Sequence, residues 1–139
     1  MSAVRIIGLV ATLTACVGAT PPEPSPDVNS LPATVTLKAG ESRTVSGAVI
    51  RFVEVKGDSR CPSDVTCVWQ GNAELIFAVG PAVGDGPTDL VPLNTGLEPR
   101  SGGALGLRLT LVTLSPNPVS TTPTKGYQAE IRIERTPAS

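Results

Sequence analysis

The chain has 139 residues, a formal net charge of −1 and no histidine. The missing histidine excludes a Ser-His-Asp triad, a Cys-His pair and any imidazole-ligated metal centre. The 11 Lys and Arg residues form no basic run, which argues against nucleic acid as a partner. We therefore expect no cofactor, no metal and no nucleic-acid partner.

Residues 1–15 have the pattern of a secretory leader. Arg5 precedes an apolar stretch at residues 6–14, and a small residue, Ala15, ends the segment. A membrane-spanning helix takes about 20 apolar residues, so this stretch is too short to remain in a bilayer. The pattern predicts export from the cytoplasm with removal of the leader.

The end of this leader, Leu13-Thr14-Ala15-Cys16, resembles the lipobox of bacterial lipoproteins. The resemblance implies cleavage before Cys16 and lipid on its thiol, which anchors the protein at the cell envelope. Residue 17 is Val and not Asp, and the same resemblance then implies the outer membrane in an organism that has one. The alternative is an ordinary secretory leader with an incidental cysteine.

The next segment, residues 16–32, reads as the lipidated cysteine followed by a tether. It is rich in proline and has little to bury, which favours an extended spacer over a strand. Such a spacer would hold a folded domain away from the membrane surface. Its prolines are Pro21, Pro22, Pro24, Pro26 and Pro32.

Residues 33–139 read as one β domain. Residues 48–55 fit a mostly buried strand, and a slip of the apolar phase at Val112 predicts a bulge. Elsewhere apolar residues alternate with polar ones, as in strands with one buried face. The alternating sets are Val35 and Leu37; Ala73, Leu75, Phe77 and Val79; Leu105, Leu107, Leu109 and Leu111; and Tyr127, Ala129, Ile131 and Ile133.

Turn-rich segments at residues 39–41, 80–89, 92–103 and 115–126 separate these strands. Short strands divided by Gly- and Pro-rich turns are typical of all-β proteins. We expect about seven short antiparallel strands in a sandwich or barrel, Ig-like in general architecture.

Two cysteines, Cys61 and Cys67, remain once Cys16 is assigned to lipid. An even pair in an exported protein usually forms a disulfide, which here would close one small loop. Their spacing lacks the Cys-x-x-Cys arrangement of thiol oxidoreductases, and two thiolates are too few for a zinc site. A redox or metal role is the alternative.

Around these cysteines, the segment from Asp58 to Ala73 reads D-S-R-C-P-x-x-V-x-C-x-W-x-G-x-A. This pattern resembles the signature of a group of small, uncharacterised bacterial envelope lipoproteins. The resemblance covers about residues 33–135 and includes the Leu114-Ser115-Pro116 turn and the Tyr127-led last strand. It implies location and fold, and no biochemical activity.

The motif also makes predictions from its residue types. If Cys67 begins a strand, Trp69 lies on the same face and its indole covers the disulfide. Gly71 interrupts that strand pattern and fits a bulge or a close approach of two backbones. Both interpretations are structural.

The polar residues of the motif suit turns and ion pairs. Asp58 and Asp64 can accept backbone N–H bonds in turns, and Arg60 can pair with either of them or with Glu74. The functional alternative is a recognition loop that the disulfide holds ready for a partner. That loop would present Asp58, Arg60, Pro62, Asp64, Trp69 and Gly71.

The leading functional hypothesis is a non-enzymatic envelope module that binds a protein or glycan partner or has an accessory structural role. No catalytic residues are assigned. A protease-inhibitor-like loop is one alternative, Ser-Lys chemistry at Lys38, Lys56 or Lys125 is another, and a weak calcium site at Asp85 and Asp89 is a third. A histidine-independent hydrolase would need two carboxylates at a working separation. The available acids are Asp58, Asp64, Glu74, Asp85, Asp89 and Glu98.

Overall fold

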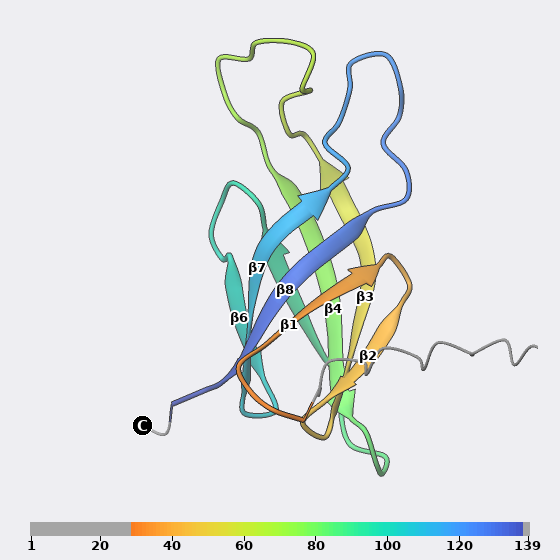
Figure 1. Cartoon of the computed structure of the whole chain (residues 1–139), viewed down its shortest axis with the longest axis vertical. Helices are drawn as coiled ribbons and strands as arrows, with labels where there is room; N and C mark the ends of the chain where they lie inside the picture. The colour runs from red at the N-terminus through yellow and green to blue at the C-terminus, as the bar shows by residue number, and fades with distance from the viewer. Residues whose placement is uncertain (1–28, 138–139) are drawn as a thin grey trace, which may run out of the picture.

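The computed structural model describes residues 29–137, which form two antiparallel β-sheets packed face to face (Figure 1). The leader, Cys16 and most of the expected tether lie outside the described residues. Among residues 29–137, no helix is long and apolar enough to cross a membrane. The strands are β1 (Ala33–Lys38), β2 (Ser42–Val45), β3 (Ala48–Asp58), β4 (Ala73–Pro81), β5 (Asp89–Asn94), β6 (Ser101–Ala104), β7 (Leu107–Ser115) and β8 (Gln128–Arg135).

One sheet has the order β1-β8-β7-β6 and the other β2-β3-β4-β5. The all-β sandwich is therefore confirmed, with eight strands in the described residues where about seven were expected. The strands that are easiest to overlook, β2 and β6, have four residues each. Segments this short carry too few apolar positions to show an alternation.

The core forms where the inner faces of the two sheets meet. Side chains that alternate along the strands are buried, and Phe52 of β3 stacks on Phe77 of β4 with ring centroids 5.1 Å apart. The predicted alternation of β4 and β8 is confirmed. In these two strands Ala73, Leu75, Phe77, Val79, Ala129, Ile131 and Ile133 are fully buried.

The prediction of turns throughout residues 92–103 is wrong at both ends of that segment. Pro92 lies in β5, an edge strand that pairs only with β4, so one side of its backbone needs no N–H donor. Gly102 lies in β6, and a Cβ there would be 2.5 Å from Cγ1 of Val91, so glycine allows β6 to pack closely on β5. Proline and glycine usually indicate turns in a sequence, but here each lies within a strand at a position that suits it.

The apolar alternation predicted for β7 runs from Leu105 to Leu111 and then changes phase at Val112. The predicted bulge is confirmed, because the β7–β8 register shifts between Leu111 and Thr113. Leu114 is buried, as the slip predicts, whereas Val112, expected on the same apolar face, is 48% exposed. Leu105 is not on that face: it lies in the turn before β7 with a φ of 50° and is 46% exposed. The alternation therefore begins at Leu107.

The sandwich has two different ends. The loop end has three long connections, at residues 59–72, 95–100 and 116–127, beside the short turn at residues 39–41. The turn end has the connections at residues 46–47, 82–88 and 105–106. β1 begins at the turn end, because Ala33 pairs with Ile133 near the close of β8, whose first residue follows a loop of the loop end. The chain therefore joins the sandwich opposite the loop end.

Candidate recognition site

The three connections of the loop end are held together by polar contacts between residues far apart in the sequence. Figure 1 shows the connection after β3 and the connection after β7 rising beside each other above the sheets. The motif from Asp58 to Gly71, for which a recognition loop was the functional alternative, lies almost entirely in the first of them.

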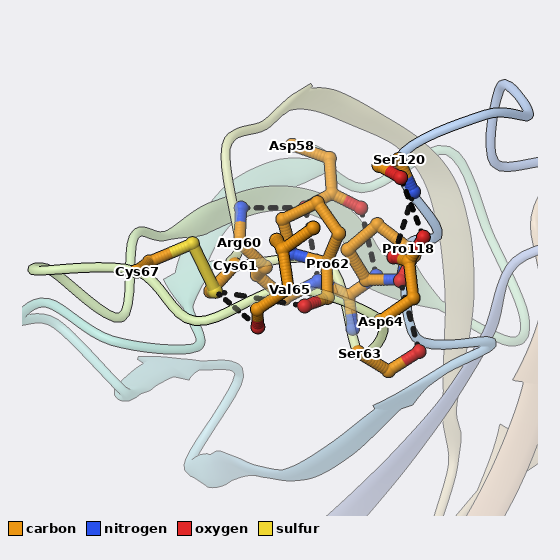
Figure 2. Close-up of a disulfide and its surroundings, with 10 residues drawn as sticks. All are labelled: Asp58, Arg60, Cys61, Pro62, Ser63, Asp64, Val65, Cys67, Pro118 and Ser120. Carbon is orange, nitrogen blue, oxygen red and sulfur yellow. Dashed lines mark hydrogen bonds and ion pairs between the residues drawn. A yellow bond between two sulfur atoms is a disulfide. The ribbon is translucent and has the colours of Figure 1, made fainter.

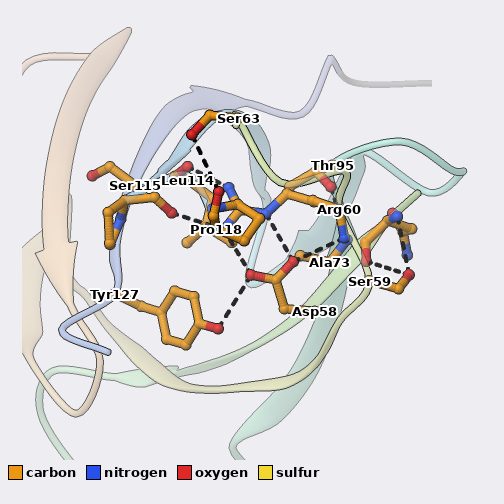
Figure 3. Close-up of polar contacts among 12 residues, drawn as sticks. Asp58, Ser59, Arg60, Ser63, Ala73, Thr95, Leu114, Ser115, Pro118 and Tyr127 are labelled. Atoms are coloured by element: carbon orange, nitrogen blue, oxygen red, sulfur yellow. Dashed lines mark hydrogen bonds and ion pairs between the residues drawn. The ribbon is translucent and has the colours of Figure 1, made fainter. Parts of the chain in front are cut away.

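Arg60 is the centre of these contacts (Figure 3). Its guanidinium makes a bidentate pair with Asp58, with Nε 2.9 Å from Oδ1 and Nη2 2.7 Å from Oδ2. Nη1 donates to the carbonyl of Leu114 at 2.8 Å, and Nη2 to that of Pro116 at 2.9 Å. Of the three acids expected as partners of Arg60, Asp58 is the one that pairs, and Arg60 thereby joins the β3–β4 connection to the end of β7.

Asp58 is held by three groups. Its Oδ1 also accepts the backbone N–H of Arg60 at 3.1 Å, which confirms the predicted turn contact, and its Oδ2 accepts the hydroxyl of Tyr127 at 3.1 Å. Burial raises the pKa of Asp58, but the hydrogen bonds and charge of Arg60 outweigh it and leave the pKa below the ordinary value. Burial and the Asp58 carboxylate together raise the pKa of Tyr127. Asp58 is therefore ionised and Tyr127 protonated at neutral pH.

The predicted disulfide between Cys61 and Cys67 is present (Figure 2). The loop it closes is bound to the β7–β8 connection: the backbone N–H of Ser63 donates to the carbonyl of Pro118 at 2.9 Å. Asp64 accepts the backbone N–H of Ser120 at 2.9 Å and the hydroxyl of the same residue. These bonds from Ser120 lower the pKa of Asp64. Asp64 accepts a backbone N–H bond, as predicted, but the donor Ser120 belongs to another connection, so Asp64 joins two loops.

The expectation that Trp69 covers the disulfide is wrong. The described chain has no strand between Asp58 and Ala73, so Cys67 begins none, and the Trp69 side chain is 82% exposed. Two backbone bonds explain the loop: Ser59 N–H donates to the Asn72 carbonyl at 2.7 Å, and the Cys61 N–H donates to the Gln70 carbonyl at 2.8 Å. They close residues 62–69 into a loop in which alternation between faces no longer applies.

Gly71 has the predicted close backbone approach. Its φ is 71°, and a Cβ built on it would lie 1.8 Å from the carbonyl oxygen of Ser59. No side chain fits there without moving the backbone, and left-handed φ is itself unfavourable for other residues. Gly71 therefore lets the two arms of the β3–β4 connection touch.

A second set of contacts, centred on Asn72, was not found from the sequence. Its Nδ2 donates to Oδ1 of Asn94 at 2.8 Å, and its Oδ1 accepts the N–H groups of Gly96 and Leu97 at 2.9 and 3.3 Å. Thr95 Oγ1 accepts the N–H of Ala73 at 2.8 Å. The run Asn94-Thr95-Gly96 signals a turn, but nothing in the sequence links it to Asn72.

The loop end also carries exposed apolar side chains and a groove. Val65, Val68, Trp69, Leu97 and Val119 are all exposed on its three connections. Between these connections lie two adjoining hollows of about 290 and 240 Å³, which share Arg60, Thr95 and Asn117 as walls. The first is lined by Arg60, Cys61, Gln70, Gly71, Thr95, Gly96, Asn117 and Pro118, and the second by Arg60, Thr95, Arg100, Leu111, Val112, Thr113, Leu114 and Asn117.

Asp58 and Glu74 line one open hollow of about 270 Å³, but each is paired with a cation, and the other acids considered for catalysis lie elsewhere. Glu74 lies 3.5 Å from Nζ of Lys56, and Glu98 accepts the backbone N–H of Arg100 at 2.9 Å. Asp85 and Asp89 are at the turn end, away from Asp58 and Asp64. Within residues 29–137, no three or more His, Cys, Asp or Glu side chains gather as a metal site would require.

The loop end is therefore a braced set of loops with paired charges, an exposed tryptophan and a groove. Neither a known protein family, nor a curated protein, nor a solved structure matches this chain at a significant level.

Proposed function

We propose that the chain is the precursor of a lipid-anchored envelope protein whose β domain is a non-enzymatic binding module. The partner binds at the loop end. The observation that carries this proposal is the coexistence there of exposed apolar side chains and a scaffold that holds them in place. Isolated exposed hydrophobic residues need no explanation, but a cluster on a braced surface is typical of an interaction site.

The anchor follows from the N-terminal pattern. The lipobox-like segment ending at Cys16 supplies a thiol for acylation, and two or more acyl chains give stable attachment to a bilayer. The proline-rich residues that follow act as a spacer. β1 begins at the turn end, so the spacer joins the sandwich at the end opposite the loop end.

The bracing bears on affinity. Ordering loops on binding costs about 0.5–1.5 kcal/mol for each immobilised side chain, and loops that are already ordered avoid much of that cost. Arg60, Asn72 and the disulfide hold the three connections before any partner arrives. Trp69 would be the main anchor of the interface, because tryptophan is enriched among the residues that dominate binding energy.

The same contacts favour binding over the two alternatives. An inhibitor loop presents extended backbone to a protease, whereas Ser63 and Asp64 of the disulfide loop are bound to Pro118 and Ser120. A carboxylate-pair hydrolase needs acids free to act, whereas Asp58 is held by Arg60 and Tyr127.

The binding proposal is tested by photo-crosslinking from two matched positions. Val68 and Val83 are both 91% exposed and both lie in loops, one at each end of β4. A photoreactive residue in place of Val68 in envelopes of the native organism should give a discrete crosslinked product. The same residue in place of Val83 should give none, and equal labelling from both positions would contradict the proposal.

The anchor is tested separately by metabolic labelling with a radioactive fatty acid. The full chain should incorporate label and sediment with membranes. Cys16→Ala should lose both properties, while Cys61→Ser with Cys67→Ser should retain them. Membrane association of an unlabelled Cys16→Ala protein would exclude the lipid anchor.

A further inference from the structure

We propose that the groove between the three connections of the loop end binds an oligosaccharide. The inference rests on the proposed binding function and names its ligand class. It combines three observations: side chains on the groove with unused hydrogen-bonding groups, bare backbone where the walls meet, and an exposed tryptophan next in sequence to a residue of the groove wall.

The unused hydrogen-bonding groups belong to Gln70, Asn117 and Arg100. Within residues 29–137, no partner satisfies the two side-chain amides or the guanidinium of Arg100, although the backbones of Gln70 and Arg100 are bonded. Each amide offers both donors and acceptors. A sugar hydroxyl is also donor and acceptor at once, so amides on facing walls match a ring of hydroxyls.

The walls approach closely because two glycines face each other. A Cβ on Gly96 would lie 2.4 Å from the carbonyl oxygen of Gly71, so at these two glycines the β5–β6 and β3–β4 connections touch through their backbones. Each hollow lies a little below the range of about 300–1,000 Å³ typical of small-ligand sites. Because they share Arg60, Thr95 and Asn117, they lie side by side, and together they offer room for a short chain of sugar rings.

Trp69 directly precedes Gln70, a residue of the groove wall, and it is 82% exposed. An indole offers a flat apolar face, and the C–H face of a pyranose ring is its natural counterpart. The disulfide at Cys67 and the bond from the Cys61 N–H to the Gln70 carbonyl bracket Trp69. The indole therefore projects from a backbone that is fixed next to the groove-wall residue Gln70.

Charge and backbone contacts disfavour other ligands. Arg60 is neutralised by Asp58, so Arg100 is the one unpaired cation among the described residues that line the two hollows, and a strongly acidic ligand would find a single counter-charge there. A peptide that adds as a strand needs free backbone groups at the edge of β7. There the N–H of Leu111 is already bonded to Arg100, and the carbonyl of Leu114 to Arg60.

The test uses the fluorescence of the full-length protein. Trp69 is the only tryptophan of the chain, so its emission reports on this position alone. The protein is purified in a zwitterionic detergent without a sugar headgroup and titrated with an N-acetylglucosamine hexamer, a maltose-type hexamer and peptide-free peptidoglycan strands. At least one should shift the emission and protect the indole from acrylamide quenching.

Matched variants separate the groove from the rest of the surface. Gln70→Ala and Asn117→Ala should each weaken sugar binding by about tenfold, and Trp69→Ala, followed by calorimetry, by at least about thirtyfold. Val83→Ala at the turn end should bind like the parent protein. All four positions are exposed, so thermal melting should be unchanged.

Failure of this inference differs from failure of the proposed function. The oligosaccharide site is refuted if none of the three glycans alters Trp69 emission at glycan concentrations on the order of 10 mM. It is also refuted if Gln70→Ala and Asn117→Ala bind sugar as tightly as the parent protein. Crosslinking of a protein from position 68 in the same envelopes would then leave a binding module with a different ligand. Capture of an extended peptide in the groove would likewise overturn the sugar assignment.

Discussion

The two ends of the sandwich connect the same strands by different physical means. At the turn end, β2–β3 and β6–β7 are joined by residue pairs with positive φ, 48° and 82° at Ser46-Gly47 and 50° and 70° at Leu105-Gly106. Positive φ at both central residues is what a type I′ hairpin turn requires. At the loop end, side-chain contacts between distant residues replace local backbone geometry. Substitutions at the turn end should therefore change stability through backbone conformation, and those at the loop end through lost side-chain contacts.

The largest difference is expected at Arg60. Arg60→Ala removes four side-chain contacts and leaves the nearly buried Asp58 carboxylate, whose side chain is 8% exposed, without its counter-ion. Breaking such a pair typically costs about 3–5 kcal/mol of unfolding free energy. Arg132→Ala is the control, because its pair with Glu134 is exposed and worth at most about 1 kcal/mol. Urea unfolding of both variants measures the contrast, and equal losses would contradict it.

Gly71 and Gly47 give a matched pair, one from each end. Alanine at either position meets an unfavourable left-handed φ, which costs about 1–2 kcal/mol. At Gly47 nothing lies within 4 Å of the new Cβ, whereas at Gly71 it overlaps the Ser59 carbonyl. Gly71→Ala should therefore lose clearly more stability than Gly47→Ala in the same unfolding assay. A smaller loss of stability at Gly71 would mean that the backbone around Ser59 shifts to make room for the new Cβ at little cost in free energy.

Loss of the disulfide is expected to have the next largest effect on stability. Replacing Cys61 and Cys67 by serine frees a loop that the chain-entropy relation values at about 2.4 kcal/mol. Guanidinium unfolding of the parent and the double variant measures the loss. Addition of a reductant should lower the stability of the parent to that of the variant and leave the variant unchanged. A reductant effect on the variant would point to a cause other than this bond.

Acid should loosen the loop end. The pKa of Asp58 is lowered in the folded protein, while an unfolded aspartate has a pKa of about 3.9. Its contribution is therefore complete above that value and is lost as the pH falls through the folded pKa. Asp58→Asn should flatten the fall in stability below about pH 4. Some slope should remain from Asp64, whose pKa is also lowered, and an unaltered slope would show that Asp58 contributes little.

The smallest effect is expected at the turn end and has the opposite sign. Leu105 has a φ of 50° and an exposed side chain, so it bears conformational strain without a buried contact. Asparagine tolerates left-handed φ better than leucine does, and Leu105→Asn should raise the unfolding free energy by about 0.5–1 kcal/mol. Thermal unfolding measures the gain. A loss would mean that Leu105 makes a contact worth more than its strain.

Sequence reasoning succeeded where one short-range rule decides the structure. Alternation along β4 and β8 predicted the buried faces, because successive side chains of a strand point to opposite sides. Gly71 was interpreted correctly because only glycine accepts such a close approach. The cysteine pair was interpreted correctly because few other fates suit two nearby thiols in a chain that is expected to be exported.

It failed where the structure depends on which distant segments meet. The rule that predicted β4 placed Trp69 on a strand face, because it cannot detect that the bond between Cys61 and Gln70 turns the segment into a loop. The partners of Asn72 and Asp64 come from other connections, at Asn94 and Ser120. Such pairings depend on how the sandwich assembles, and no local sequence pattern predicts them.

The pairing of β1 with β8 has a consequence for how the protein folds. Ala33 and Ile133 are neighbours in one sheet although most of the described chain separates them. Synthesis runs from the N-terminus, so the first strand is made long before its only partner in the sheet. Closing so long a loop is also slow, because the chain loses conformational entropy before the contact between the strands stabilises it. Until β8 is available, β1 keeps an unpaired, partly apolar edge, and this sheet is completed only when nearly the whole chain is present.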